Sequence, residues 1–203
     1  MDKAIIYIHG KGENTKETAH YKPLFNDCDI IGFDYKSETP WEAKDEFTAF
    51  INKVCRNYDA VFIIANSIGA FFVMNADMNK KIKKAFFISP IVNMERLIKD
   101  MMTNANITEN ELHEKKEIKT PCGDTISWKY LNYVRNHPLK WNIPTHILYG
   151  EKDTFTSFDA MTSFAKDIGA TLDIMKNGEH WFHTKQQMEF LDKWILVRIK
   201  NNL

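Results

Sequence analysis

Short apolar runs that alternate with helical patterns constrain the fold of this 203-residue chain more than any other feature of its sequence. The runs at 4–9, 60–65 and 84–89 are almost continuously apolar, which is typical of strands buried on both faces of a parallel sheet. Because strand and helix patterns alternate along the chain, we expect a doubly wound, mostly parallel six-stranded α/β sheet flanked by helices. Strand-like composition completes the set of six at 29–35, 145–150 and 171–176.

Punctuating residues mark where the intervening helices begin and end. Thr39 followed by Pro40 predicts a helix start, and Gly169 predicts the end of another helix. Apolar residues also continue directly after Ser67 and recur through 185–199. We therefore expect helices after the strands, as in a doubly wound fold.

The stretch 91–141 interrupts this alternation, because about fifty residues separate two strands and ordinary loops are much shorter. It carries helix signals of its own, with apolar residues at helical spacing from Met94 onward and a capping pair at Thr108 and Glu111. We expect a single domain over 1–203 that contains a helical insertion at 91–141, to be read as a cap or lid.

Composition excludes several classes of protein. The 27 basic and 27 acidic residues cancel, which argues against a nucleic-acid binder. No run approaches the about 20 apolar residues that a membrane-spanning helix needs, and the N-terminal apolar stretch is too short for a signal peptide. Cys28, Cys55 and Cys122 are odd in number and widely spaced, so neither a disulfide framework nor a zinc site is indicated. We expect a cytoplasmic protein with no metal and no cofactor.

One serine stands between a buried strand and an apolar helix, in the segment Ala65-Asn66-Ser67-Ile68-Gly69. A turn between a strand and a helix must be tight here, and bulky residues two positions before or after the serine would collide. The start of the helix and the Ile68 backbone N–H would add positive potential beside the hydroxyl. The pentapeptide alone also fits an ordinary serine in a tight turn, so its context decides.

A serine hydroxyl is a poor nucleophile and needs a base that a carboxylate orients. Asp153 lies three residues past Gly150, and His180 lies four residues past Lys176. Both positions follow the end of a predicted strand, where ligands of open parallel sheets bind. We therefore expect Ser67, Asp153 and His180 to meet at one edge of the sheet.

Four segments follow one another along the chain, at 7–14, 65–70, 147–153 and 177–182. In this combination and order they resemble the α/β-hydrolase family. The resemblance implies that Ser67 is the nucleophile, His180 the general base and then acid, and Asp153 the orienting carboxylate. It also implies that the backbone N–H groups of Lys11 and Ile68 form the oxyanion hole. This chain departs from the family pattern in two ways, because alanine stands at position 65, two residues before Ser67, and no strand precedes the run at 4–9. A trimmed core is therefore expected.

Other residues compete for these roles. His183 lies three residues after His180, and Glu151 and Asp159 lie close to Asp153. We favour His180 and Asp153 because they stand in the loops just past strand ends. His9 is expected to hold its turn rather than to act in catalysis.

The resulting hypothesis is a serine hydrolase that cleaves a carboxylic ester of a small or medium acyl substrate through an acyl-enzyme. Peptide or amide cleavage, acyl transfer with the same residues, and a non-catalytic binding module on the same fold stay open as alternatives. The only expected partner is the small-molecule substrate, and the sequence does not fix an oligomeric state. The residues expected to line a substrate pocket, unless they simply pack in the core, are Met94, Ile98, Trp128 and Trp181.

Overall fold

A six-stranded sheet organises the computed structural model, which describes residues 2–25, 27–121 and 123–198. Cys122 therefore lies outside the described residues. The strand order is β2-β1-β3-β4-β7-β8, and each neighbouring pair is parallel. This confirms the predicted fold class. The strands are β1 (Lys3–Ile8), β2 (Asp29–Phe33), β3 (Ala60–Asn66), β4 (Ile82–Ile88), β7 (Thr145–Gly150) and β8 (Thr171–Met175).

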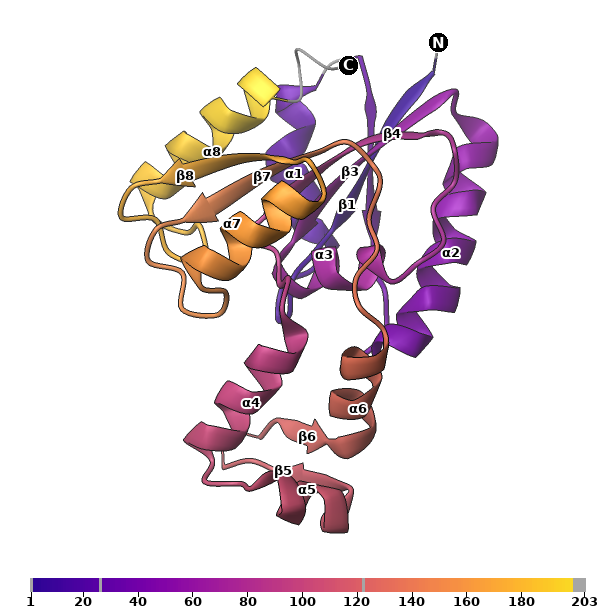
Figure 1. The fold of residues 1–203 in the computed structure, drawn as a ribbon. Coiled ribbons are helices and arrows are strands. Elements are labelled where there is room, and N and C mark those ends of the chain that lie inside the picture. The colour runs from indigo at the N-terminus through magenta and orange to yellow at the C-terminus, as the bar shows by residue number, and fades with distance from the viewer. Residues whose placement is uncertain (1, 26, 122, 199–203) are drawn as a thin grey trace. The chain divides into compact units, whose positions relative to one another are not determined.

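One face of the sheet packs against the helices α1 (Thr18–Tyr21) and α8 (Lys185–Arg198). Alternate strand residues such as Tyr7, Phe62 and Phe86 form a buried cluster with the apolar side chains of these helices. The imidazole Nε2 of His20 in α1 lies 2.7 Å from a carboxylate oxygen of Asp192 in α8. Figure 1 shows α8, in yellow, and α1 on the same side of the sheet.

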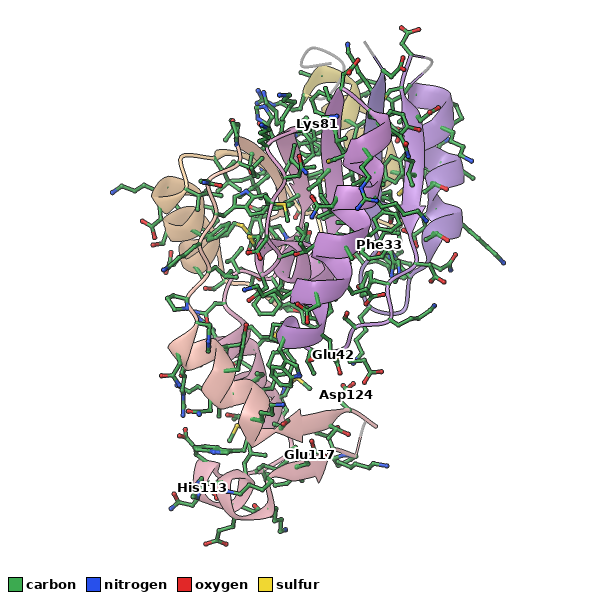
Figure 2. All side chains as sticks on the ribbon, turned by 90° about the vertical axis from the view of Figure 1, so that its right-hand side faces the viewer. Phe33, Glu42, Lys81, His113, Glu117 and Asp124 are labelled. Carbon is green, nitrogen blue, oxygen red and sulfur yellow. The ribbon has the colours of Figure 1, made fainter. Side chains whose placement is uncertain are left out.

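The opposite face is covered by α2 (Pro40–Asn57), α3 (Ser67–Met74) and α7 (Phe158–Asp167) (Figure 1). Phe33 of β2, labelled in Figure 2, stacks on Phe50 of α2 with ring centroids 3.9 Å apart. Thr39 and Glu42 form a capping box at the start of α2, as the Thr39–Pro40 pair indicated. At the other end of α2, the Lys81 ammonium donates hydrogen bonds to two backbone carbonyls at 2.7 and 2.8 Å (Figure 2).

Residues Asn93–Leu139 form a compact unit of their own. It contains α4 (Met94–Asn104), α5 (Glu109–Lys115), an antiparallel pair β5 (Glu117–Lys119) and β6 (Thr125–Ser127), and α6 (Trp128–Asn136). Arg135 of α6 bonds one carboxylate oxygen of Glu95 at 2.9 Å and both of Glu109 at 2.6 and 2.8 Å, which ties the three helices together. The strand pair was not predicted, because two strands of three residues are too short to show a period of two.

The segment between β1 and β2 also contains short elements that the sequence analysis did not predict. They are η1 (Thr15–Glu17), the single turn α1, and η2 (Lys22–Leu24). A helix of one turn is too short to show apolar periodicity, so only a capping residue could indicate it in the sequence. Of these elements η1 has such a cap: the Asn14 side chain accepts a hydrogen bond from the Lys16 backbone N–H.

In the described part of the chain, none of the helices has both the length and the apolar character needed to cross a membrane.

The last helix is tied to the edge strand β8 through one carboxylate. Asp173 accepts a hydrogen bond from the Trp194 indole N–H at 2.8 Å. It also accepts from the Arg198 guanidinium at 2.8 and 2.6 Å, one bond to each carboxylate oxygen. Within the described residues, strand β8 pairs with β7 alone, so these side-chain bonds contribute to holding the edge that leads into the loop after β8.

We predict that Asp173→Ala lowers the free energy of unfolding by about 1–2 kcal/mol, because it leaves partly buried donors of Trp194 and Arg198 without their acceptor. Urea denaturation followed by circular dichroism measures this change. Asp45→Ala, at an exposed position of α2, is the control and should leave stability within about 0.5 kcal/mol of the wild type. A loss no larger than that of the control would contradict the structural role of Asp173.

Candidate active site

Ser67 stands at the turn where β3 ends and α3 begins, in a backbone conformation that residues other than glycine rarely adopt. Its φ is +48°, in the left-handed region. Two residues later, a Cβ atom on Gly69 would lie 2.4 Å from the backbone oxygen of His9. A larger residue at 69 would therefore push the start of α3 away from the turn after β1, which is the collision that the sequence predicted.

Ala65, the other small residue of this turn, is fully buried in β3. It pairs with Ile8 on one side and Phe87 on the other. The alanine methyl group is accommodated there, so the departure from glycine leaves the turn intact.

The structure brings Ser67, His180 and Asp153 together in that order. The Ser67 Oγ lies 2.8 Å from His180 Nε2, and His180 Nδ1 lies 2.7 Å from Asp153 Oδ2. A carboxylate accepts hydrogen bonds, so Nδ1 is the nitrogen that donates to it. The lone pair of Nε2 is then left to accept the hydrogen bond of the Ser67 hydroxyl.

Asp153 is held on both of its oxygens. Its side chain is fully buried. While Oδ2 accepts from His180, Oδ1 accepts the backbone N–H groups of Phe155 at 2.8 Å and Thr156 at 3.1 Å. These bonds fix the carboxylate and, through it, the plane of the imidazole.

Two glycines allow the loops that carry Asp153 and His180 to touch. A Cβ on Gly150 would lie 2.4 Å from the Glu179 backbone oxygen, and a Cβ on Gly178 would lie 3.1 Å from the Gly150 Cα. The Lys152 backbone N–H donates to the Gly178 oxygen at 2.7 Å. The loops after β7 and β8 therefore meet backbone against backbone, which sets the distance between the carboxylate and the imidazole.

The competing residues have other partners. Glu151 is exposed and accepts the Asn177 backbone N–H at 2.8 Å, and Asp159 lies in the first turn of α7. The His183 Nδ1 lies 2.8 Å from the backbone oxygen of Trp181, and the His183 ring stacks on the Trp181 indole.

His9 is buried in the turn after β1. Its Nδ1 donates to the Gly10 backbone oxygen at 2.8 Å, and its ring stacks on Tyr35 at 4.4 Å between centroids. These contacts agree with the expected role in shaping the turn.

The turn after β1 lies beside Ser67, because β1 and β3 are neighbours in the sheet. A Cβ on Gly10 would lie 3.3 Å from the Ser67 Cβ. Lys11 follows in this turn and is exposed, and Ile68 is the second residue of α3. The two backbone segments expected to supply oxyanion donors therefore flank the hydroxyl, while their role as donors stays a prediction.

Comparison with known proteins adds to this geometry. No protein-family model and no curated protein matches the chain. Among solved structures, alpha/beta hydrolase domain-containing protein 10 from mouse matches with a TM-score of 0.77 and 16% identity, over 98% of this chain and 90% of that chain. Est1E from Butyrivibrio proteoclasticus matches with a TM-score of 0.74 and 15% identity, over 98% and 87%. A lipase-esterase related protein from Clostridium acetobutylicum matches with a TM-score of 0.66 and 17% identity, over 99% and 94%.

The chain has the α/β-hydrolase fold. Within this α/β-hydrolase fold, Ser67, Asp153 and His180 follow β3, β7 and β8 respectively. In the described residues of the chain, no group of three or more His, Cys, Asp or Glu side chains is arranged to hold a metal ion.

Sequence reasoning missed a polar network beside the strand–helix turn at Ser67 of this α/β-hydrolase fold. The Asn66 amide Nδ2 donates to the Tyr7 hydroxyl at 3.0 Å and to Glu13 Oε2 at 3.3 Å. The same Glu13 oxygen accepts the Gly10 backbone N–H at 2.6 Å, and the Tyr7 hydroxyl donates to Glu17. Glu13 thus links the turn after β1 to the residue before Ser67. No local pattern announces this link, because it depends on the pairing of β1 with β3.

The pocket residues expected from the sequence fall in different parts of the molecule. Met94 and Ile98 lie on the buried side of α4, and Trp128 begins α6, where its ring meets that of His113. Trp181 follows His180 and is 62% exposed. Their contact with substrate stays a prediction.

Burial raises the pKa of the Glu17 carboxyl above its ordinary value of 4.5. The folded state therefore keeps a proton that the unfolded chain has already lost, and stability falls as the pH rises from the unfolded pKa through the folded one. Glutamine stays uncharged and can still accept the hydrogen bond of Tyr7.

We therefore predict that Glu17→Gln is more stable than the wild type at pH 8, and that this difference disappears at or below about pH 4. Thermal denaturation of both proteins across this pH range measures it. Glu189→Gln, at an exposed position of α8, should show no such trend. A Glu17→Gln protein less stable than the wild type at pH 8 would refute the burial argument.

Proposed function

We propose that the protein is a serine hydrolase that cleaves a carboxylic ester of a small or medium acyl group. The observation that carries this proposal is the unbroken chain of contacts from the Ser67 hydroxyl through the His180 imidazole to the Asp153 carboxylate. A serine in an ordinary turn has no need of an imidazole at 2.8 Å that a buried carboxylate orients. Such an arrangement supplies the base that a hydroxyl requires to act as a nucleophile.

The proposed reaction follows from these contacts. The Ser67 Oγ attacks the ester carbonyl carbon while His180 Nε2 takes the hydroxyl proton. The carbonyl oxygen becomes an oxyanion, which the backbone N–H groups of Lys11 and Ile68 stabilise. The C–O bond to the alcohol then breaks, and the leaving oxygen takes the proton from His180 Nε2. Asp153 stabilises the imidazolium that forms in between.

Water completes the cycle. His180 Nε2 takes a proton from a water molecule, whose oxygen attacks the acyl-enzyme carbonyl carbon. Collapse of the second oxyanion breaks the bond to the Ser67 Oγ, which recovers its proton from His180. The products are the free acid and the unchanged enzyme, and the proposed cycle requires no metal or organic cofactor.

Similar structures support the general class. The proteins with this fold include an esterase from Pyrococcus furiosus and a monoacylglycerol lipase from Paleococcus ferrophilus, at 17% and 15% identity. At such low identities, the structural likeness supports a hydrolase scaffold alone, so the ester preference rests on the site itself.

Unpaired Cys28 and Cys55 are compatible with the reducing cytoplasm in which we place the protein.

We predict that Ser67→Ala lowers the turnover of p-nitrophenyl acetate and butyrate by at least about four orders of magnitude while leaving the fold intact. Turnover is followed by release of p-nitrophenol, and circular dichroism checks the fold. Ser89→Ala is the matched control, because Ser89 also has a positive φ (+44°) at the end of the neighbouring strand β4. It should retain wild-type turnover.

Equal turnover by the wild type and Ser67→Ala would refute the proposed nucleophile. Product analysis separates the related activities. Free acid is the expected product even when alcohols or thiols are added. A transferred acyl group would indicate an acyltransferase instead.

A further inference from the structure

Phe155 presents a half-exposed aromatic ring beside the imidazole of His180. The two ring centroids are 4.6 Å apart and the planes are inclined by 52°. Phe155 is nevertheless 49% exposed, so much of its apolar surface stays in contact with water. Exposed phenylalanine next to a reactive group is informative because its burial by a ligand is favourable.

Hydrogen bonds of the loop backbone and of Thr156, and not packing of the phenyl ring, hold Phe155 in place. The Phe155 backbone N–H donates to Asp153 Oδ1 at 2.8 Å. The next residue, Thr156, is anchored by its side-chain bond to the Pro90 oxygen at 3.2 Å and by its carbonyl, which accepts the Tyr149 hydroxyl at 2.8 Å. The loop is therefore held without help from the phenyl group, which leaves the ring free to serve another purpose.

The chemistry of ester cleavage defines what must come close to this ring. The leaving oxygen receives its proton from His180 Nε2, so it has to lie within hydrogen-bond distance of that nitrogen. The alcohol part of the ester therefore lies beside the imidazole against which the Phe155 ring packs. The acyl group, in contrast, is bonded to Ser67 and remains after the alcohol has left.

We propose that Phe155 is a specificity-determining residue that recognises the alcohol part of the ester. The alcohol is apolar and bulky, aromatic or branched, since it covers a half-exposed phenyl ring. This inference rests on the proposed hydrolase function. It assigns the two halves of the substrate to different contacts, with the alcohol against Phe155 and the acyl group elsewhere.

The test compares two series of esters on the wild type and on Phe155→Ala. In the first series butyrate is esterified with methanol, cyclohexanol or benzyl alcohol. In the second series methanol esterifies acetate, butyrate or hexanoate. Each ester is compared between the two proteins, so its intrinsic reactivity cancels. Phe155→Leu keeps an apolar side chain and guards against a loss of folding in the alanine variant.

The chain offers a matched control in Phe158. It lies three residues later, is equally exposed at 50%, and packs its ring near Tyr149 at 6.2 Å instead of on His180. Phe158→Ala removes the same side chain from the same neighbourhood without touching the imidazole.

We expect Phe155→Ala to lower kcat/KM for benzyl and cyclohexyl butyrate by about 10-fold or more relative to methyl butyrate, as for a lost apolar contact. Phe155→Leu should fall between this variant and the wild type. The ratios within the methyl ester series should not change, because deacylation and acyl binding do not involve the alcohol. Phe158→Ala should keep both patterns of the wild type.

An equal loss for methyl and benzyl butyrate would overturn the assignment of Phe155 while the hydrolase function stood. An equal loss is also what we would measure if another part of the protein, and not the alcohol, covered the Phe155 ring. A selectivity loss in Phe158→Ala as large as that in Phe155→Ala would also overturn it. If the wild type hydrolysed none of these esters, the proposed function would fall and this inference with it.

Discussion

The close approach of α3 to the turn after β1 is the constraint on which the candidate site depends. Only glycine fits at position 69, because a Cβ there would lie 2.4 Å from the His9 oxygen. The helix can therefore begin directly at Ser67, whose left-handed backbone (φ +48°) turns the chain sharply out of β3. This conformation is strained, and the buried strands around it supply the packing that maintains it. The result is a partly buried hydroxyl at the edge of the sheet, beside the turn after β1 and at the start of α3.

A second close approach, between Gly150 and the 178–179 backbone, supplies the partners of that hydroxyl. In the sheet order β4 lies between β3 and β7, and β8 is the edge strand, so His180 has to reach back from the edge toward β3. The loop after β8 can do so because it rests on the loop after β7, where Asp153 is fixed by two backbone N–H groups. Geometry at the two glycines thus controls the imidazole, and the Asp173 contacts to α8 support the strand from which it comes.

The fold could be predicted from the sequence because strands buried on both faces are almost continuously apolar, as 60–65 and 84–89 are. The meeting of Ser67, Asp153 and His180 could be predicted from their places after strand ends, while their catalytic roles stay a prediction. What could not be predicted depends on register or on short elements. The link from Glu13 to Asn66 needs the pairing of β1 with β3. Phe155 contacts His180 only because two loops meet, and the pair β5–β6 is too short to show a period.

Covalent labelling with a fluorophosphonate tests the central claim most directly, because this reagent reacts with serine hydroxyls that an adjacent base and oxyanion donors activate. Intact mass measurement, followed by peptide mapping, reports how many adducts form and where. The convergence of the three segments predicts one adduct per chain, on Ser67, and none on the folded Ser67→Ala protein. A folded wild type that forms no adduct, or forms one that survives Ser67→Ala, would contradict it.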